Sequence, residues 1–269
     1  MYTGMPARRR RPAVVVVAVA TVTVGFLALP LVGLLTKAPW GSLWSDLSSP
    51  VATDALRLSL ICSLWATGLS LVLGLPLAWV LARVEFPGRN LVRALTILPM
   101  VLPPVVGGVA LLLAFGRDGV LGRPLFNWFG IQFTFSTAGV VLAETFVAMP
   151  FLIITVEAAL RSMDGRYEEA ASTLGAGRWT VFRRVTLPLI SSSLIAGAAL
   201  TWARALGEFG ATITFAGDIQ GRTQTLPLAV YLALEGNEPV AVALSLALLA
   251  VSVVVLVALR GRWLGAIAP

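Results

Sequence analysis

Two opposite charges stand four residues apart within one apolar stretch of this sequence. Arg204 and Glu208 would share one face of an α-helix, where they can form an ion pair. A charge among apolar side chains is costly and normally faces a protein interior or water. The pair has two interpretations: a structural ion pair that fixes the rotation of its helix, or an arginine that lines the route of an anion while Glu208 holds it. Glu144 is a further acid in an apolar stretch; it could pair with Arg204, and polar packing suits it better than contact with an anion.

The other reactive side chains are few. The sequence has no His, a single Lys at Lys37 and a single Cys at Cys62. Without His there is no imidazole proton relay, no His-based metal site and no Ser-His or Cys-His nucleophile pair. A Walker A loop needs Gly-Lys-Ser/Thr to hold phosphates, whereas Lys37 lies between Thr36 and Ala38. We therefore expect no catalytic residue, no metal site and no cofactor bound by this chain, with Cys62 as a core residue.

Prolines interrupt another apolar stretch. Pro99, Pro103 and Pro104 are followed by Gly107 and Gly108. Proline removes a backbone donor and kinks a helix. A kink at Pro103 and Pro104 could place a turn against a pathway between helices and form a gate; a tolerated irregularity, common in membrane helices, is an equally good interpretation.

A short polar segment follows the stretch that holds Arg204. It brings one cation and three hydrogen-bonding side chains together at Arg222, Thr223, Gln224 and Thr225. These groups suit a tetrahedral oxyanion, and they also suit contact with a docking protein. A plain solvated loop is the third interpretation.

The composition indicates the elements that position these residues. Hydrophobic residues make up 58% of the chain and charged residues 12%, about half the charge of a typical soluble domain. Apolar stretches of roughly 20 residues are long enough to cross a bilayer. We predict an all-α membrane protein with about six transmembrane helices. The expected spans are residues 13–35, 56–81, 95–115, 138–160, 189–215 and 240–259.

The arginines predict the orientation of these spans. Fourteen of the 20 Lys and Arg residues fall at one set of alternating loops and ends, and positive charge is retained on the cytoplasmic side. The excess of basic residues therefore indicates membrane topology rather than a nucleic-acid partner. We expect a cytoplasmic tail at residues 1–12, a single transmembrane domain at 13–260 and a cytoplasmic tail at 261–269. The expected outer loops are 37–54, 116–137 and 217–237, and the longest inner loop is 161–188.

The inner loop 161–188 is expected to fold into two short helices. Helix formers run from Tyr167 to Leu174, Asp164 is a capable N-cap, and Gly175 suits a left-handed stop. A second helical stretch runs from Trp179 to Val185. Arg178, Arg183 and Arg184 would then face lipid head groups or a partner.

The same loop carries a spaced pattern, E-A-A-x3-G-x9-I-x-L-P. Its matching residues are Glu169, Ala170, Ala171, Gly175, Leu187 and Pro188, with Val185 in place of Ile. It resembles the EAA loop of permease subunits of binding-protein-dependent ABC importers. The resemblance implies that the loop helix lies in a groove of a cytoplasmic ATPase subunit and passes its motion to the membrane helices. An ordinary amphipathic loop helix is the alternative.

Two further segments resemble permeases of molybdate transporters. One holds the runs Gly-Glu-Phe-Gly-Ala and Gly-Arg-Thr-Gln-Thr-Leu-Pro-Leu between Ala203 and Glu235; the other is LPMVLPPVVGG from Leu98 to Gly108. Sulfate permeases share the Gly-Glu-Phe/Tyr-Gly core but differ after it. With the EAA loop, the likeness covers roughly residues 53–259.

This resemblance implies a permease subunit of the cell membrane that is not itself an enzyme. It would import molybdate, or sulfate or tungstate of the same group, from an extracytoplasmic binding protein. A homodimer would work with two ATPase subunits that use ATP. The rivals are an ion-coupled secondary carrier, which often shows internal repeats that are not found here, and a non-transporting membrane anchor, which leaves the buried charges unexplained.

Overall fold

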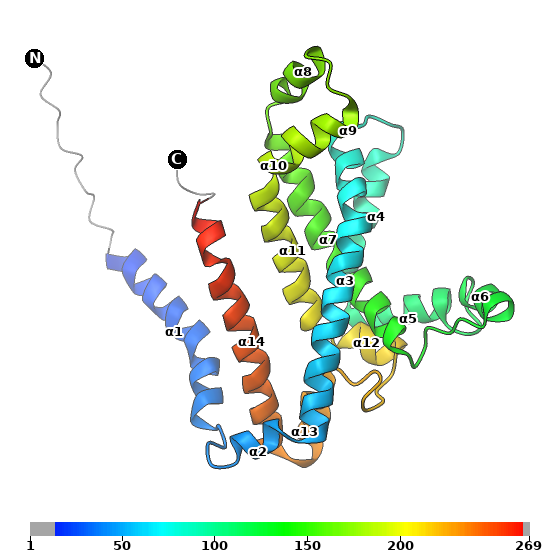
Figure 1. Ribbon diagram of the computed structural model, residues 1–269. Coiled ribbons are helices and arrows are strands. Elements are labelled where there is room, and N and C mark those ends of the chain that lie inside the picture. The colour runs from blue at the N-terminus through cyan, green and yellow to red at the C-terminus, as the bar shows by residue number, and fades with distance from the viewer. Residues whose placement is uncertain (1–13, 266–269) are drawn as a thin grey trace, which may run out of the picture.

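The computed structural model describes residues 14–265, and in this part of the chain all regular structure is helical (Figure 1). Four helices are long and apolar enough to cross a membrane: α1 (Val14–Thr36), α3 (Pro50–Arg83), α7 (Thr137–Ser162) and α14 (Glu238–Gly265). Two bent helix pairs raise the number to six if each pair is one span. The predicted all-α membrane fold is therefore confirmed. The expected tail 1–12 lies outside the described residues, as do residues 266–269, and α14 continues past residue 260.

Helices α3, α7 and α11 (Ser191–Leu206) form the centre of the bundle (Figure 1). Small residues let them approach one another closely, as is usual between membrane helices. Ala66, Ala148 and Ala205 form a fully buried cluster at their contact. A Cβ added to Gly74 of α3 would lie 3.1 Å from Cγ1 of Ile153 on α7.

The bundle has two distinct ends, which Figure 1 shows at its top and bottom. Helices α8 (Arg166–Thr173) and α9 (Arg178–Val181) cover one end, which we call the α8 end. The other, the α2 end, holds α2 (Leu43–Leu47) and α13 (Leu226–Gly236). The N-terminal end of α1 and the C-terminal end of α14 both lie toward the α8 end, as an even number of spans requires.

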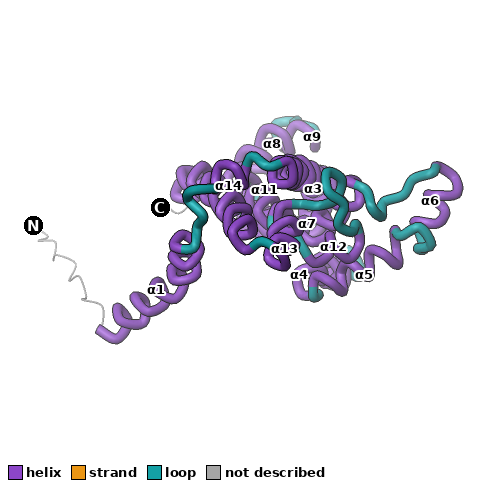
Figure 2. The backbone as a smooth tube through the Cα atoms, turned by 90° about the horizontal axis from the view of Figure 1, so that it is seen from below, coloured by secondary structure: helices purple, strands orange, loops and turns teal. Residues whose placement is uncertain are grey.

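The third expected span, 95–115, is broken rather than kinked. Helix α4 (Arg89–Val101) and helix α5 (Pro104–Phe115) meet at an angle of 118°. Leu102 and Pro103 both precede a proline, which disfavours helical backbone, and both are extended, with ψ near 136° and 133°. Figure 2 shows that α5 leads away from the bundle into an arm that ends at α6 (Gly122–Phe129).

The fifth expected span, 189–215, is also divided. Helix α11 ends at Leu206, and α12 (Gly210–Phe215) begins after a break. The expected outer loops contain the helices α2, α6 and α13. The second span begins at Pro50, because the Ser49 side chain caps it by accepting a hydrogen bond from Ala52 N.

Helix α1 differs from the other long helices, because none of its residues is buried. It is apolar on every side, lies beside α14 and contacts little else (Figure 1). A helix that is apolar all round needs an apolar environment on every face. Lipid or another protein chain must therefore surround it.

Candidate functional site

The EAA loop folds as a short helix with the predicted stop. The carboxylate of Asp164 accepts a hydrogen bond from Arg166 N at 3.0 Å, although the N-cap of α8 is Gly165, one residue later than expected. Gly175 has φ +83°, its N–H donates to Ser172 O, and Ala176 N donates to Ala171 O. This left-handed ending is the one that glycine supplies most cheaply.

The residues of the EAA pattern form part of the protein surface. Glu169, Ala170, Gly175 and Pro188 are exposed, and Ala171 and Leu187 are half-buried. Helix α8 buries none of its residues. Beside the pattern, Leu174 is 89% exposed and Tyr167 59%. An apolar surface of this kind at the tip of a loop is suited to contact with another protein.

The second half of the loop is helical but irregular. The expected stretch from Trp179 to Val185 is α9 followed by a π-helical turn, η1 (Phe182–Thr186), and by α10 (Leu187–Leu189). Pro188 has no N–H to continue a regular ladder. The helix then bends by 72° into α11. The three loop arginines expected to face lipid or a partner are all exposed: Arg178, Arg183 and Arg184.

Glu168, which none of the sequence motifs singled out, connects this loop to α3 and its first half to its second half. Its Oε2 lies 3.1 Å from Nη2 of Arg83, and its Oε1 accepts a hydrogen bond of 2.6 Å from the Thr186 hydroxyl. Glu169 forms no ion pair among the described residues. The helical period could have indicated this role, because Glu168 lies about one turn before Ala171, on the half-buried face of α8.

Arg204 and Glu208 form the predicted ion pair, but across a helix break. Arg204 Nη1 lies 2.6 Å from Glu208 Oε2. Glu208 follows the end of α11, and its Oε1 accepts a hydrogen bond of 2.8 Å from Ala211 N. The same carboxylate thus binds the last turn of α11 and caps the first turn of α12. Glu208 is 1% exposed, whereas the Arg204 side chain is 28% exposed.

The proline break lies against this helix break. A Cβ added to Gly210 would lie 2.7 Å from Cβ of Pro104, and one added to Gly108 would lie 2.6 Å from Cβ of Thr214. Helix α5 therefore crosses α12 at the distance that only glycine allows. The structure brings Pro104, Gly210 and the Arg204–Glu208 pair into one region, with Pro103 and Pro104 exposed beside it.

Glu144 does not pair with Arg204, whose charge is already bound by Glu208. Glu144 is 1% exposed on α7, and among the described residues its Oε2 has no hydrogen-bond partner. Arg204 and Glu208 meet because they are four residues apart in sequence. An acid on another helix has no such local advantage.

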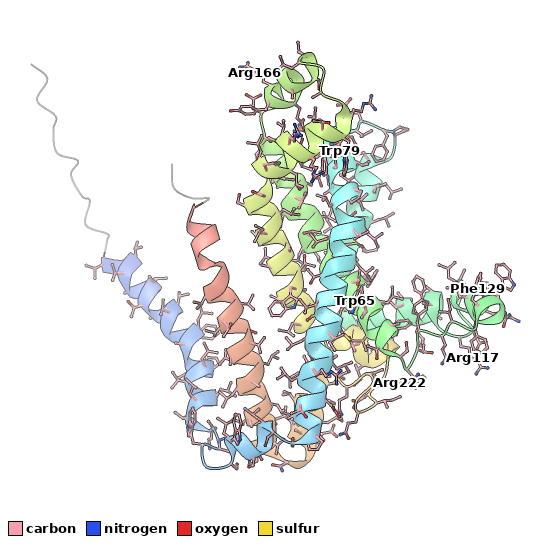
Figure 3. All side chains as sticks on the ribbon, viewed as in Figure 1. Trp65, Trp79, Arg117, Phe129, Arg166 and Arg222 are labelled. Atoms are coloured by element: carbon pink, nitrogen blue, oxygen red, sulfur yellow. The ribbon has the colours of Figure 1, made fainter. Side chains whose placement is uncertain are left out.

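The segment 222–225 is largely buried. Thr223, Gln224 and Thr225 are 0%, 8% and 1% exposed, and only Arg222 is open, toward the α2 end (Figure 3). The Thr223 hydroxyl accepts a hydrogen bond from Ile219 N. Leu226 N, directly after the segment, donates to the Ser59 hydroxyl on α3. These contacts fix the start of α13, and the described contacts do not join the segment to Arg204.

One further charged cluster was missed from the sequence. Arg93 Nη2 and Arg161 Nε lie 2.6 and 3.2 Å from the same oxygen of Glu157, which ties α4 to α7. The spacing of Glu157 and Arg161 by four residues was the available signal.

Comparison with known proteins identifies the kind of protein that has this loop and these broken spans. Residues 70–265 match the family described as binding-protein-dependent transport system inner membrane component. The chain belongs to this family. It is a multi-pass inner membrane permease of a binding-protein-dependent ABC transporter. Permeases of this family hold no cofactor, and the partner subunit hydrolyses ATP.

Several relatives are similar over most of their length. The molybdenum transport system permease protein ModB of Mycobacterium bovis is 48% identical over 88% of this chain and 89% of the relative. ModB of Escherichia coli is 43% identical over 80% and 93%. The sulfate transport system permease protein CysT of Escherichia coli is 39% identical over 86% and 84%.

Solved structures show the same fold. A bacterial alginate ABC transporter in complex with its pentasaccharide-bound periplasmic protein has a chain that superposes with a TM-score of 0.70, at 20% identity, over 92% of this chain and 91% of that one. The MetNI methionine transporter superposes with a TM-score of 0.62 over 81% and 97%, at 19% identity.

Proposed function

We propose that this chain is the membrane permease of a molybdate importer, which passes the oxyanion from an extracytoplasmic binding protein to the cytoplasm. Identity of 48% over 88% of the chain to a molybdenum transport permease is the observation that carries this proposal. Sulfate and tungstate are tetrahedral oxyanions as well. The 39% identity to a sulfate permease makes sulfate an alternative substrate, and tungstate is another because it shares the tetrahedral geometry.

In this proposal the α8 end faces the cytoplasm. The turns and helix ends there are rich in arginine, which cytoplasmic loops retain. Arginines lie in the last turns of α3 and α7, at the first residue of α4 and in the loop; they include Arg83, Arg161, Arg89, Arg166 and Arg178. The α2 end would then receive the binding protein.

The EAA loop is the proposed contact with the ATPase. Glu169, Ala170 and half-buried Ala171 belong to α8, which buries none of its residues, and exposed Gly175 follows the helix. The small side chains allow a groove to approach the helix closely. Leu187 and Pro188 lie at the bend where the loop enters α11.

Helix α11 is proposed to act as a rigid lever, which transmits the movement driven by ATP hydrolysis to the transport pathway. It starts directly after the loop and ends at the Arg204–Glu208 break. Its 16 residues span about 24 Å at 1.5 Å per residue. Movement of the loop toward or away from the membrane would therefore displace the break, where Pro104 packs on Gly210.

Arg204 is the residue proposed to attract the anion during its passage through the permease. Glu208 is fully buried, but the Arg204 side chain keeps 28% of its surface open. An arginine can bind a partner carboxylate and still offer other N–H donors to an oxyanion. Arg222 is the second candidate, at the outer end. No group of three acidic, His or Cys side chains that could hold a metal ion occurs within residues 14–265.

The working unit is proposed to be a homodimer with two ATPase subunits, surrounded by lipid. Two apolar surfaces of the described chain are exposed and would be covered by lipid or by another protein chain. Helix α1 has no buried residue. In the arm, Trp128 is 77% exposed, and Phe129, which Figure 3 labels there, is 69% exposed. Exposed apolar surfaces of this kind indicate protein or membrane contact.

Reconstitution would test the function. The permease, its ATPase and its binding protein are placed in vesicles, and uptake of molybdate, tungstate and sulfate is measured with and without ATP. We expect ATP-dependent uptake with molybdate preferred when the binding protein supplies it. Uptake driven by an ion gradient without ATP would refute the proposal.

A further inference from the structure

Helix α8 is joined to the membrane bundle by little more than its chain ends and one side chain. It buries no residue, and glycines flank it at Gly165, Gly175 and Gly177. Glycine gives the backbone wide conformational freedom. An ATPase that displaced α8 would therefore act on a helix with compliant ends.

A hollow lies beside the loop, where close packing of the loop against α3 would otherwise hold it in place. It has a volume of about 860 Å³ and lies between α3 and the second half of the loop. Trp79 and Leu75 of α3 face Trp179 and Phe182 across it. The hollow separates part of the loop from α3, and Arg83, Glu168 and Thr186 also line it.

The carboxylate of Glu168 connects the loop to the bundle. One oxygen pairs with Arg83, the last residue of α3, and the other accepts from Thr186, which is 1% exposed in the π-helical turn that leads to α11. The Arg83 and Glu168 side chains are each 23% exposed, so water only partly screens the pair. Among the described ion pairs, this is the only one that joins α8 to a long helix.

We propose that Glu168 is a positioning residue for energy coupling: it fastens α8 to α3 through Arg83 and to the start of the α11 lever through Thr186. This inference rests on the proposed function, because it requires an ATPase that moves α8. With Glu168 in place, displacement of α8 reaches α3 and α11 together. Without it, part of the displacement is lost in the glycine-flanked ends.

The test compares Glu168→Gln with wild type in the reconstituted importer. Glutamine keeps the size of the side chain and its acceptor for Thr186, but it removes the ion pair with Arg83. We expect the complex to assemble and hydrolyse ATP, while oxyanion imported per ATP falls about fivefold or more, the lower range of a typical coupling between sites. Glu85→Gln is the matched control, because Glu85 is exposed at the same end and forms no described ion pair.

A charge exchange distinguishes a specific pair from a general loss of charge. Arg83→Glu alone sets two carboxylates against each other, and Glu168→Arg alone sets two guanidinium groups together. The double variant should recover more import per ATP than either single variant. It also provides the test if Glu168→Gln fails to reach the membrane.

Two results would overturn the inference. Import per ATP in Glu168→Gln could equal that of wild type and Glu85→Gln, or a membrane-inserted double variant could do no better than the single variants. Failure of the proposed function has a different signature: the wild-type complex itself would show no ATP-dependent oxyanion uptake.

Discussion

Neutralising Arg204 separates a structural role from a role in the pathway. Arg204→Leu leaves the carboxylate of Glu208 buried at 1% exposure without its counter-charge. Removing one partner of a buried pair costs 3–5 kcal/mol. We expect a loss of about 3 kcal/mol, at the lower limit of that range, because Arg204 is partly open to solvent and Glu208 keeps its hydrogen bond from Ala211 N.

The structure dictates the second variant. Replacing Glu208 with leucine would also uncap α12, which costs about 1 kcal/mol. Glutamine keeps the acceptor for Ala211 N and removes only the charge. The double variant Arg204→Leu with Glu208→Gln should therefore regain most of the stability lost in Arg204→Leu.

Uptake then decides the role of Arg204. A charge that contributes as little as 1.4 kcal/mol to the passage of an anion changes its rate about tenfold. If Arg204 attracts the oxyanion, the stable double variant should import at least about ten times more slowly with the binding protein saturating. The assays are thermal unfolding in detergent and vesicle uptake at equal permease level. Uptake at the wild-type rate in the double variant would refute the pathway role and leave Arg222 as the candidate.

Three further predictions concern the loop, the topology and the helix crossing. Gly175→Val should lose transport and substrate-stimulated ATP hydrolysis together while still inserting into the membrane, because a backbone φ of +83° costs a β-branched residue roughly 1–2 kcal/mol. Gly175→Asn should lose less, because asparagine tolerates this backbone. Full coupling in the valine variant would contradict the assignment of the loop. In a Cys62→Ser background, an impermeant thiol reagent should label Trp44→Cys, 83% exposed at the α2 end, but not Ser172→Cys in sealed cells; the reverse labelling would invert the topology. Gly108→Ala should destabilise the permease by about 1–3 kcal/mol in thermal unfolding, because its Cβ would lie 2.6 Å from Cβ of Thr214; an unchanged midpoint would show that α5 and α12 separate easily.

The sequence by itself determined the features that depend on neighbouring residues. Apolar stretches fixed the membrane class, and the i,i+4 spacing was enough for the Arg204–Glu208 pair. The glycine stop after α8 followed from its place behind a run of helix formers. The EAA spacing indicated the family before any contact was known.

Tertiary structure decided the features that depend on what another element places nearby. Glu168 and Glu169 are adjacent acids, and only the position of Arg83 at the end of α3 makes Glu168 the joining residue. Prolines at 103 and 104 predicted an irregularity, but only the structure shows a turn of 118° and the close packing of α5 on α12. The sequence predicted that Thr223 and Thr225 are accessible polar side chains, yet the turn before α13 buries them. Local spacing specifies which groups can meet within one helix, whereas contacts between distant segments depend on the packing of the whole bundle.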